Sequence, residues 1–170
     1  SPTATKSVER AVEGRPLNNL LHLGSLISAS NSNLPEILER LRAAAVGWTR
    51  LGNFWFCNVP KAVKRNQFVS NISGRILSGL EALVLSPAEH ARLDKSMAKK
   101  LRAMMCGTAH ELLEDGTHLC MTTRELFLHW RVAPSAIELL VRRLSWWQSV
   151  AADPANNAQL LATFFGVFAF

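Results

Sequence analysis

The 170 residues suffice for one domain with a small appendage, and 48% hydrophobic against 19% charged residues excludes a disordered or low-complexity chain. Nineteen Lys and Arg against 13 Asp and Glu give a formal net charge of +6, which permits a polyanionic partner without requiring one. Three cysteines, Cys57, Cys106 and Cys120, are too few for a disulfide scaffold and indicate a reducing, intracellular compartment.

We expect the first 33 residues to form a polar leader and a short β-hairpin. Residues 1–16 are polar and lack the apolar core of a signal peptide. Two short apolar runs follow, at residues 17–23 and 25–29, and Gly24 separates them. This pattern predicts two strands joined by a tight turn.

After the hairpin the apolar residues recur at helical spacing, which predicts a mainly α chain, a bundle of five to six helices. Ser86 and Thr122 each open a capping box, with a glutamate three residues later. Prolines that suit a first helical turn mark three further helix starts, near Pro35, Pro60 and Pro134.

The last of these helices carries an apolar stripe at helical spacing. The stripe consists of Ile137, Leu140, Val141, Leu144 and Trp147. A stripe of this kind usually faces the core of a bundle, so we expect this side of the helix to be buried.

We divide the chain into three parts. Residues 1–33 are the leader and hairpin, 34–107 a basic three-helix bundle, and 108–170 a C-terminal helical segment with an apolar tail at 160–170. We interpret the tail as a terminal helix docked on the core; an interface for a missing partner, or the start of a longer apolar segment, are the alternatives. No run reaches the roughly 18 apolar residues of a membrane span.

The sequence contains none of the common catalytic motifs, and we assign no catalytic residue and no cofactor to it. Cys106, His110, His118 and Cys120 are zinc-type ligands within fifteen residues, but a close Cys-x-x-Cys pair is missing. We therefore favour loop and core residues over a metal site. Cys106, at the end of a predicted helix, is expected to pack as a small buried thiol.

Basic residues are concentrated in the middle of the chain. Between Arg40 and Arg102 there are 12 Lys and Arg against three acidic residues, an excess larger than the net charge of the whole chain. Phosphate groups would neutralise such a segment, although a solvated helix face is the simpler interpretation of any single run. The candidate contacts are Lys61, Lys64, Arg65, Lys95, Lys99 and Lys100, together with Arg142 and Arg143 beside two tryptophans.

Several short motifs occur in a fixed order over residues 17–150. They are LGSLIS from Leu23, PEI from Pro35, RLRAA from Arg40, KRNQF from Lys64, LSGLEAL from Leu77, LRAMMCG from Leu101 and ELLVRRLSW from Glu138. In this order they resemble the segment that follows the catalytic palm in non-LTR (LINE-type) retrotransposon reverse transcriptases. The resemblance covers the thumb and post-thumb region of that RNA-directed DNA polymerase.

The resemblance implies a nucleic-acid-binding thumb with an RNA–DNA hybrid or RNA as partner, and it suggests a nuclear location. Leu23, Gly24 and Ser25 would form a primer-grip-like hairpin. The Y-x-D-D carboxylates of the palm are not in this chain, so we expect a fragment or remnant that is not catalytic alone, with Mg²⁺ only where a palm is present. His22 and Ser78 stand where the family has tyrosine.

These departures leave a second interpretation open. The chain would then be a structural subunit of a larger assembly, membrane-associated or not, that it joins through its apolar C-terminal tail. The missing palm domain or another protein would be the partner of that tail.

Overall fold

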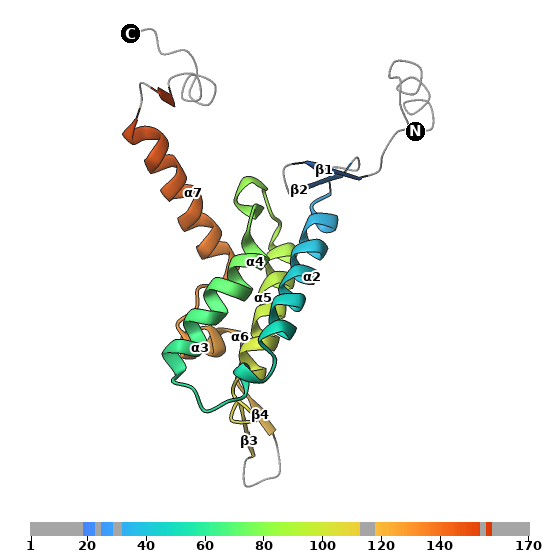
Figure 1. Cartoon of the computed structure of the whole chain (residues 1–170), viewed down its shortest axis with the longest axis vertical. Coiled ribbons are helices and arrows are strands. Elements are labelled where there is room, and N and C mark those ends of the chain that lie inside the picture. The colour runs from blue at the N-terminus through green and yellow to red at the C-terminus, as the bar shows by residue number, and fades with distance from the viewer. Residues whose placement is uncertain (1–18, 23–24, 29–31, 113–117, 154–155, 158–170) are drawn as a thin grey trace.

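The computed structural model describes residues 19–22, 25–28, 32–112, 118–153 and 156–157. The predicted mainly α class is confirmed: helices form the body of the molecule, and two small antiparallel ladders lie at its opposite ends (Figure 1). The predicted polar leader and apolar tail lie outside the described residues. Within the described part, no helix is both long enough and apolar enough to span a membrane.

The first ladder precedes the helical body. Strands β1 (Asn19–His22) and β2 (Ser25–Ser28) pair antiparallel, with Asn19 opposite Ser28 and His22 opposite Ser25. Leu23 and Gly24, which the sequence places at the turn, lie outside the described residues.

Helix α2 (Leu34–Leu51) has a proline in its first turn and ends at Gly52, whose φ of 44° is in the left-handed region that favours glycine. A short 3₁₀ turn, η1 (Gly52–Trp55), then folds the chain back. Its Trp55 is fully buried, stacks on Trp48 with ring centroids 4.5 Å apart, and donates from Nε1 to the Trp48 carbonyl at 2.9 Å. The tryptophan pair fixes the reversal.

The second long helix is interrupted by a π-helical turn. It consists of α3 (Lys61–Phe68), the π turn η2 (Val69–Ser73) and α4 (Gly74–Leu77). This helix crosses α2 closely at Gly47, where an added Cβ would lie 3.3 Å from the backbone carbonyl oxygen of Asn71 in η2. Glycine at this position therefore permits the close approach of the two helices.

Helix α5 (Pro87–Ala103) follows the 3₁₀ turn η3 (Leu80–Ala82) and begins with the predicted capping box. After α5 the chain forms a ribbon of β3 (His110–Leu112) and β4 (His118–Cys120), which the sequence pattern does not predict. Three-residue strands are too short to show an alternating apolar pattern. Helices α6 (Thr123–Trp130) and α7 (Ser135–Ala152) complete the described chain.

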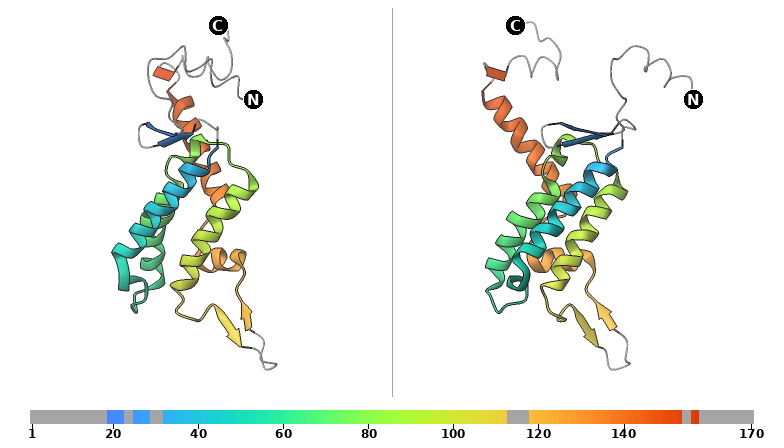
Figure 2. Two further views of the ribbon diagram at one scale, coloured as in Figure 1. Left: turned by 90° about the vertical axis from the view of Figure 1, so that its right-hand side faces the viewer. Right: turned by 45° about the vertical axis from the view of Figure 1, so that its right-hand side comes forward.

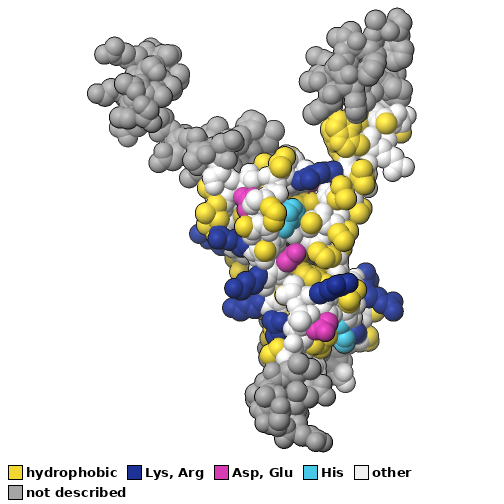
Figure 3. Space-filling model, turned by 180° about the vertical axis from the view of Figure 1, so that it is seen from behind, with side chains coloured by type: hydrophobic (Ala, Val, Ile, Leu, Met, Phe, Trp, Pro, Cys, Tyr) yellow, Lys and Arg dark blue, Asp and Glu magenta, His cyan; other side chains and the backbone are white. Residues whose placement is uncertain are grey.

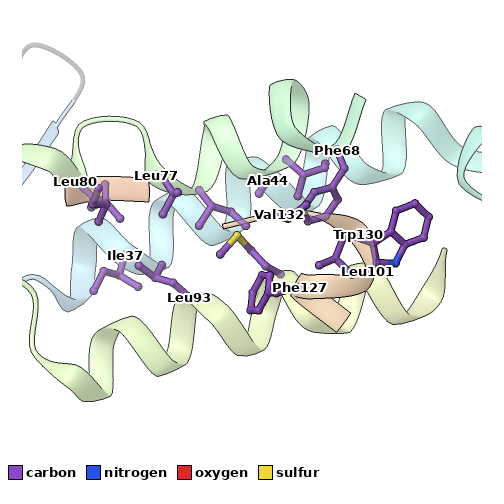
Figure 4. Close-up of a cluster of buried hydrophobic side chains, with 14 of the residues drawn as sticks. Ile37, Ala44, Phe68, Leu77, Leu80, Leu93, Leu101, Phe127, Trp130 and Val132 are labelled. Atoms are coloured by element: carbon purple, nitrogen blue, oxygen red, sulfur yellow. The ribbon is translucent and has the colours of Figure 1, made fainter. Parts of the chain in front are cut away.

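One hydrophobic cluster joins the helices. Figure 4 shows Ile37, Leu77, Leu80 and Leu93 toward one end of the cluster. It shows Phe68, Leu101, Phe127 and Trp130 toward the other end. Because every bundle helix contributes to this core, the core fixes the positions of the side chains on the outer faces of α3 and α5.

The predicted burial of the apolar stripe on α7 is wrong for four of its five residues, and the fifth, Trp147, is half-buried. Ile137, Leu140, Val141 and Leu144 are 52–59% exposed, whereas Leu139 on the opposite side is fully buried. The physical reason is that α7 packs against η3 and α5 through the side that carries Leu139 and Arg143, and beyond this contact it runs away from the bundle (Figures 1 and 2). Most of its length therefore has no helix of the bundle beside it.

Candidate nucleic-acid interface

The carboxylates near the bundle bind backbone N–H groups at helix starts. Glu89 accepts a hydrogen bond from the backbone N–H of Ser86 at 2.7 Å, and Glu125 accepts one from the backbone N–H of Thr122, also at 2.7 Å. These backbone hydrogen bonds are the main cause of a lowered pKa for both glutamates. Both carboxylates therefore act as caps of α5 and α6 rather than as partners of lysines.

A third carboxylate caps a helix from another helix. Asp94 on α5 accepts a hydrogen bond from the backbone N–H of Ser135 at 2.8 Å, at the first position of α7. The Ser135 hydroxyl lies 3.0 Å from Nδ1 of His90. Since Pro134 at the N-cap supplies no side-chain cap, α5 provides the acceptor that α7 lacks.

Among the described residues, the cations of α3 and α5 have no acidic partner. In the part of the chain that the structure describes, the ion pairs are Arg40–Glu36, Arg42–Glu39 and Arg142–Glu138, on α2 and α7. None involves a lysine or arginine of α3 or α5. On the face in Figure 3, Lys and Arg side chains flank the helical body and acidic side chains are isolated spots.

On α5 the predicted contacts lie on the outside of the bundle. Lys95 and Lys99 are exposed, whereas Lys100 is half-buried and donates to the Ser96 hydroxyl at 3.3 Å. Burial, and then the charge of Lys99, lower the pKa of Lys100. Lys99 and Lys100 therefore repel each other, and an anion bound beside them would reduce this repulsion.

On α3 the three predicted residues have different surroundings. Lys61 is exposed and its Nζ lies 5.5 Å from the ring centroid of Trp130, a cation–π contact. Lys64 is 8% exposed. Arg65 donates from Nε to the carbonyl of Arg131 at 3.0 Å, so it ties α3 to the end of α6.

The arginines of α7 are occupied within the protein. Arg142 pairs with Glu138 at 3.1 Å. Arg143 donates to the carbonyls of Glu81, at 2.7 Å, and Leu83, and so holds α7 against the η3 turn. The structure thus gives Arg143 a role in positioning α7.

The remaining predicted residues lie away from the cations of α3 and α5 or are not described. Ser25 is the first residue of β2, and the other two hairpin residues lie outside the described chain. His110 pairs with Cys120 across the ribbon, but in the described residues no three potential ligands come together as a metal site. Cys106 is exposed, with a φ of 51°, so the prediction of a buried thiol is wrong: α5 ends three residues before it.

Sequence reasoning missed a hollow of about 350 Å³ between the start of α3, the end of α5 and the end of α6. Lys61 and Lys64 line it together with Met104, His129 and Trp130. Burial, and then the charge of Lys61, lower the pKa of His129. The capping box at Thr122 predicts where α6 lies in the sequence, but nothing in the sequence places the end of α6 beside α3.

Comparisons of the chain with models of protein families, with curated proteins and with solved structures find no match.

The two capping boxes predict an acid-sensitive fold. A glutamate whose pKa is lowered in the folded chain stabilises the fold fully at pH values above its ordinary pKa of 4.5. This stabilisation disappears as the pH falls through the lowered pKa. We expect Glu89→Gln with Glu125→Gln to reduce stability at neutral pH and to flatten the loss of stability below about pH 4.5. Urea denaturation across this pH range measures both effects.

The matched control is Glu39→Gln, which removes a carboxylate that caps no helix. It should leave the slope of stability against pH close to that of the unmodified chain. An equal slope for the double variant and the unmodified chain would show that the capping boxes do not carry the acid sensitivity.

Proposed function

We propose that the chain binds nucleic acid, either an RNA–DNA hybrid or RNA, through the cations on the outer faces of α3 and α5. The observation that carries the proposal is that these cations have no carboxylate partner in the described residues, while the nearby Glu89 and Asp94 bind backbone N–H groups. Like charges on one exposed helix face repel, and phosphate groups would compensate them.

The order of the sequence motifs gives the proposal a more specific form. KRNQF lies on α3, LRAMMCG at the end of α5, and ELLVRRLSW on α7, so three of the motifs that resemble the reverse transcriptase thumb lie on three different helices. We propose that the chain is a thumb-like part or remnant of a non-LTR retrotransposon reverse transcriptase, non-catalytic by itself. A nuclear location belongs to this proposal.

Exchange of the two exposed lysines of α5 tests the proposal. Lys95→Gln combined with Lys99→Gln should weaken binding of a fluorescently labelled RNA–DNA hybrid by roughly tenfold or more at low salt, since each lost phosphate contact removes counterion release. Fluorescence anisotropy measures the affinity, and thermal unfolding checks that the exposed substitutions leave the fold intact.

Arg42→Gln is the matched control, because Arg42 is exposed and already paired with Glu39 at 2.7 Å. It removes one positive charge and should change the affinity by less than about twofold, since the charge it removes is already compensated within the protein. Equal losses for Arg42→Gln and for Lys99→Gln would mean that net charge alone determines binding, and the surface proposed here would be wrong.

The exposed stripe on α7 favours a second candidate function, that of a subunit that pairs with a second copy of the chain. In an antiparallel pair of α7 helices, Ile137 of one copy would lie opposite Leu144 of the other, and Leu140 opposite Val141, so the stripe is self-complementary. The exposure of this stripe, rather than the tail at 160–170, supports the candidate, because the tail lies outside the described residues.

Leu140→Gln with Leu144→Gln tests this candidate. Both side chains are more than half exposed, so the exchange should change the free energy of unfolding by less than about 1 kcal/mol and abolish self-association. Sedimentation velocity over a range of protein concentrations measures the association. Leu128→Gln, an exposed leucine on α6, is the control, and a monomeric unmodified chain at every concentration would rule the candidate out.

A further inference from the structure

The start of α3 lacks the anionic group that caps the neighbouring helices. Its N-cap residue is Pro60, no side chain caps it, and its first turn contains no acidic residue. By contrast, α5 and α6 begin with capping glutamates, Glu89 and Glu125. Among the described residues, nothing therefore compensates the positive end of the helix dipole at the start of α3, which lies beside the hollow.

Two buried polar groups that line the same hollow also lack partners among the described residues. Lys64 is 8% exposed, and no carboxylate lies within ion-pair distance of it there. Trp130 is 4% exposed, and its indole Nε1 has no hydrogen-bond acceptor. Burying an N–H donor without an acceptor is unfavourable, so the Trp130 indole calls for an acceptor, and Lys64 adds a positive charge to the lining of the same hollow.

We propose that this hollow binds a phosphate monoester. A dianionic phosphate would be neutralised by Lys61 and Lys64 and would accept hydrogen bonds from the start of α3. It would also accept one from the Trp130 indole after a small rotation of the ring, because Nε1 is enclosed in this structure. The two positive charges of Lys61 and Lys64 match the two negative charges of a phosphate monoester. A phosphodiester within a nucleic-acid strand carries only one negative charge. The methionines Met104 and Met105 add an apolar wall for the group that carries the phosphate.

The inference rests on the proposed function only for one source of the phosphate, the 5′-phosphorylated end of a nucleic-acid strand. A free nucleotide is the other source. The probes are therefore inorganic phosphate, a nucleoside 5′-monophosphate, the same nucleoside without phosphate, and one oligonucleotide with either a 5′-phosphate or a 5′-hydroxyl.

Calorimetric titration of the full chain tests the site. We expect the nucleoside monophosphate to bind and the bare nucleoside not to bind. Lys64→Met keeps the buried aliphatic part of the side chain and removes its charge. It should weaken binding of the nucleoside monophosphate by about tenfold or more. Lys100→Met removes a half-buried lysine outside the lining of the hollow, and should change this affinity by less than about twofold.

A spectroscopic readout makes the test independent of global stability. The indole N–H resonance of Trp130, assigned by its disappearance in Trp130→Phe, should shift when the monophosphate is added to the unmodified chain. Lys64→Met should abolish this shift at the same ligand concentration. An unchanged indole resonance at saturation would overturn the site.

The outcomes separate this inference from the proposed function. Binding of the monophosphate that depends on Lys64, with no binding of either oligonucleotide, would leave the phosphate site standing and remove the nucleic-acid role. Equal binding of the 5′-phosphate and 5′-hydroxyl oligonucleotides, with no binding of the monophosphate, would overturn the phosphate site and leave the nucleic-acid role standing.

Discussion

Carboxylate caps at the starts of three helices are the interactions on which the rest of the structure depends. Glu89 and Glu125 cap their own helices, and Asp94 caps α7 from α5. The first two fix where α5 and α6 begin, and the third holds the start of α7 against α5. These side chains bind backbone N–H groups, and among the described residues none of them forms an ion pair with a lysine of α3 or α5.

The same constraint connects the two surfaces for which functions are proposed. The outer face of α5 presents Lys95 and Lys99, and the start of α3 presents Lys61 beside the buried Lys64. On α5 the uncompensated charge is exposed, which suits the mobile phosphates of a nucleic-acid strand. At the start of α3 two lysines line a hollow beside a buried indole N–H, which suits a single group held there.

Local signals in the sequence predict where the helices begin. The capping boxes at Ser86 and Thr122 lie at the starts of α5 and α6, and Gly52 ends α2. These predictions succeed because caps and breakers act through bonds within a few residues. The ribbon of β3 and β4 escapes prediction because its strands are too short to carry a pattern.

Tertiary relations could not be predicted in the same way. The stripe on α7 has the spacing of a buried face, yet the Asp94 cap and the Arg143 hydrogen bonds to the η3 turn direct the opposite side of α7 inward. Likewise, the sequence marks Lys64 as one cation among several, and only the packing of α3 against α6 shows that it is buried next to Trp130. The sequence therefore predicts which basic residues form the candidate site. It does not predict which of them are buried or which groups lie next to them in the folded chain.

The salt dependence of RNA–DNA hybrid binding tests the central claim most directly. If the cations of α3 and α5 bind phosphate groups, the logarithm of the affinity falls linearly with the logarithm of the salt concentration, with a slope of about −0.9 per neutralised phosphate. Contacts by Lys61, Lys95 and Lys99 alone predict a slope close to −3, reduced to about −1 when Lys95 and Lys99 are both exchanged for glutamine. An affinity that does not change with salt, or a slope that is the same with and without these two lysines, would contradict the claim.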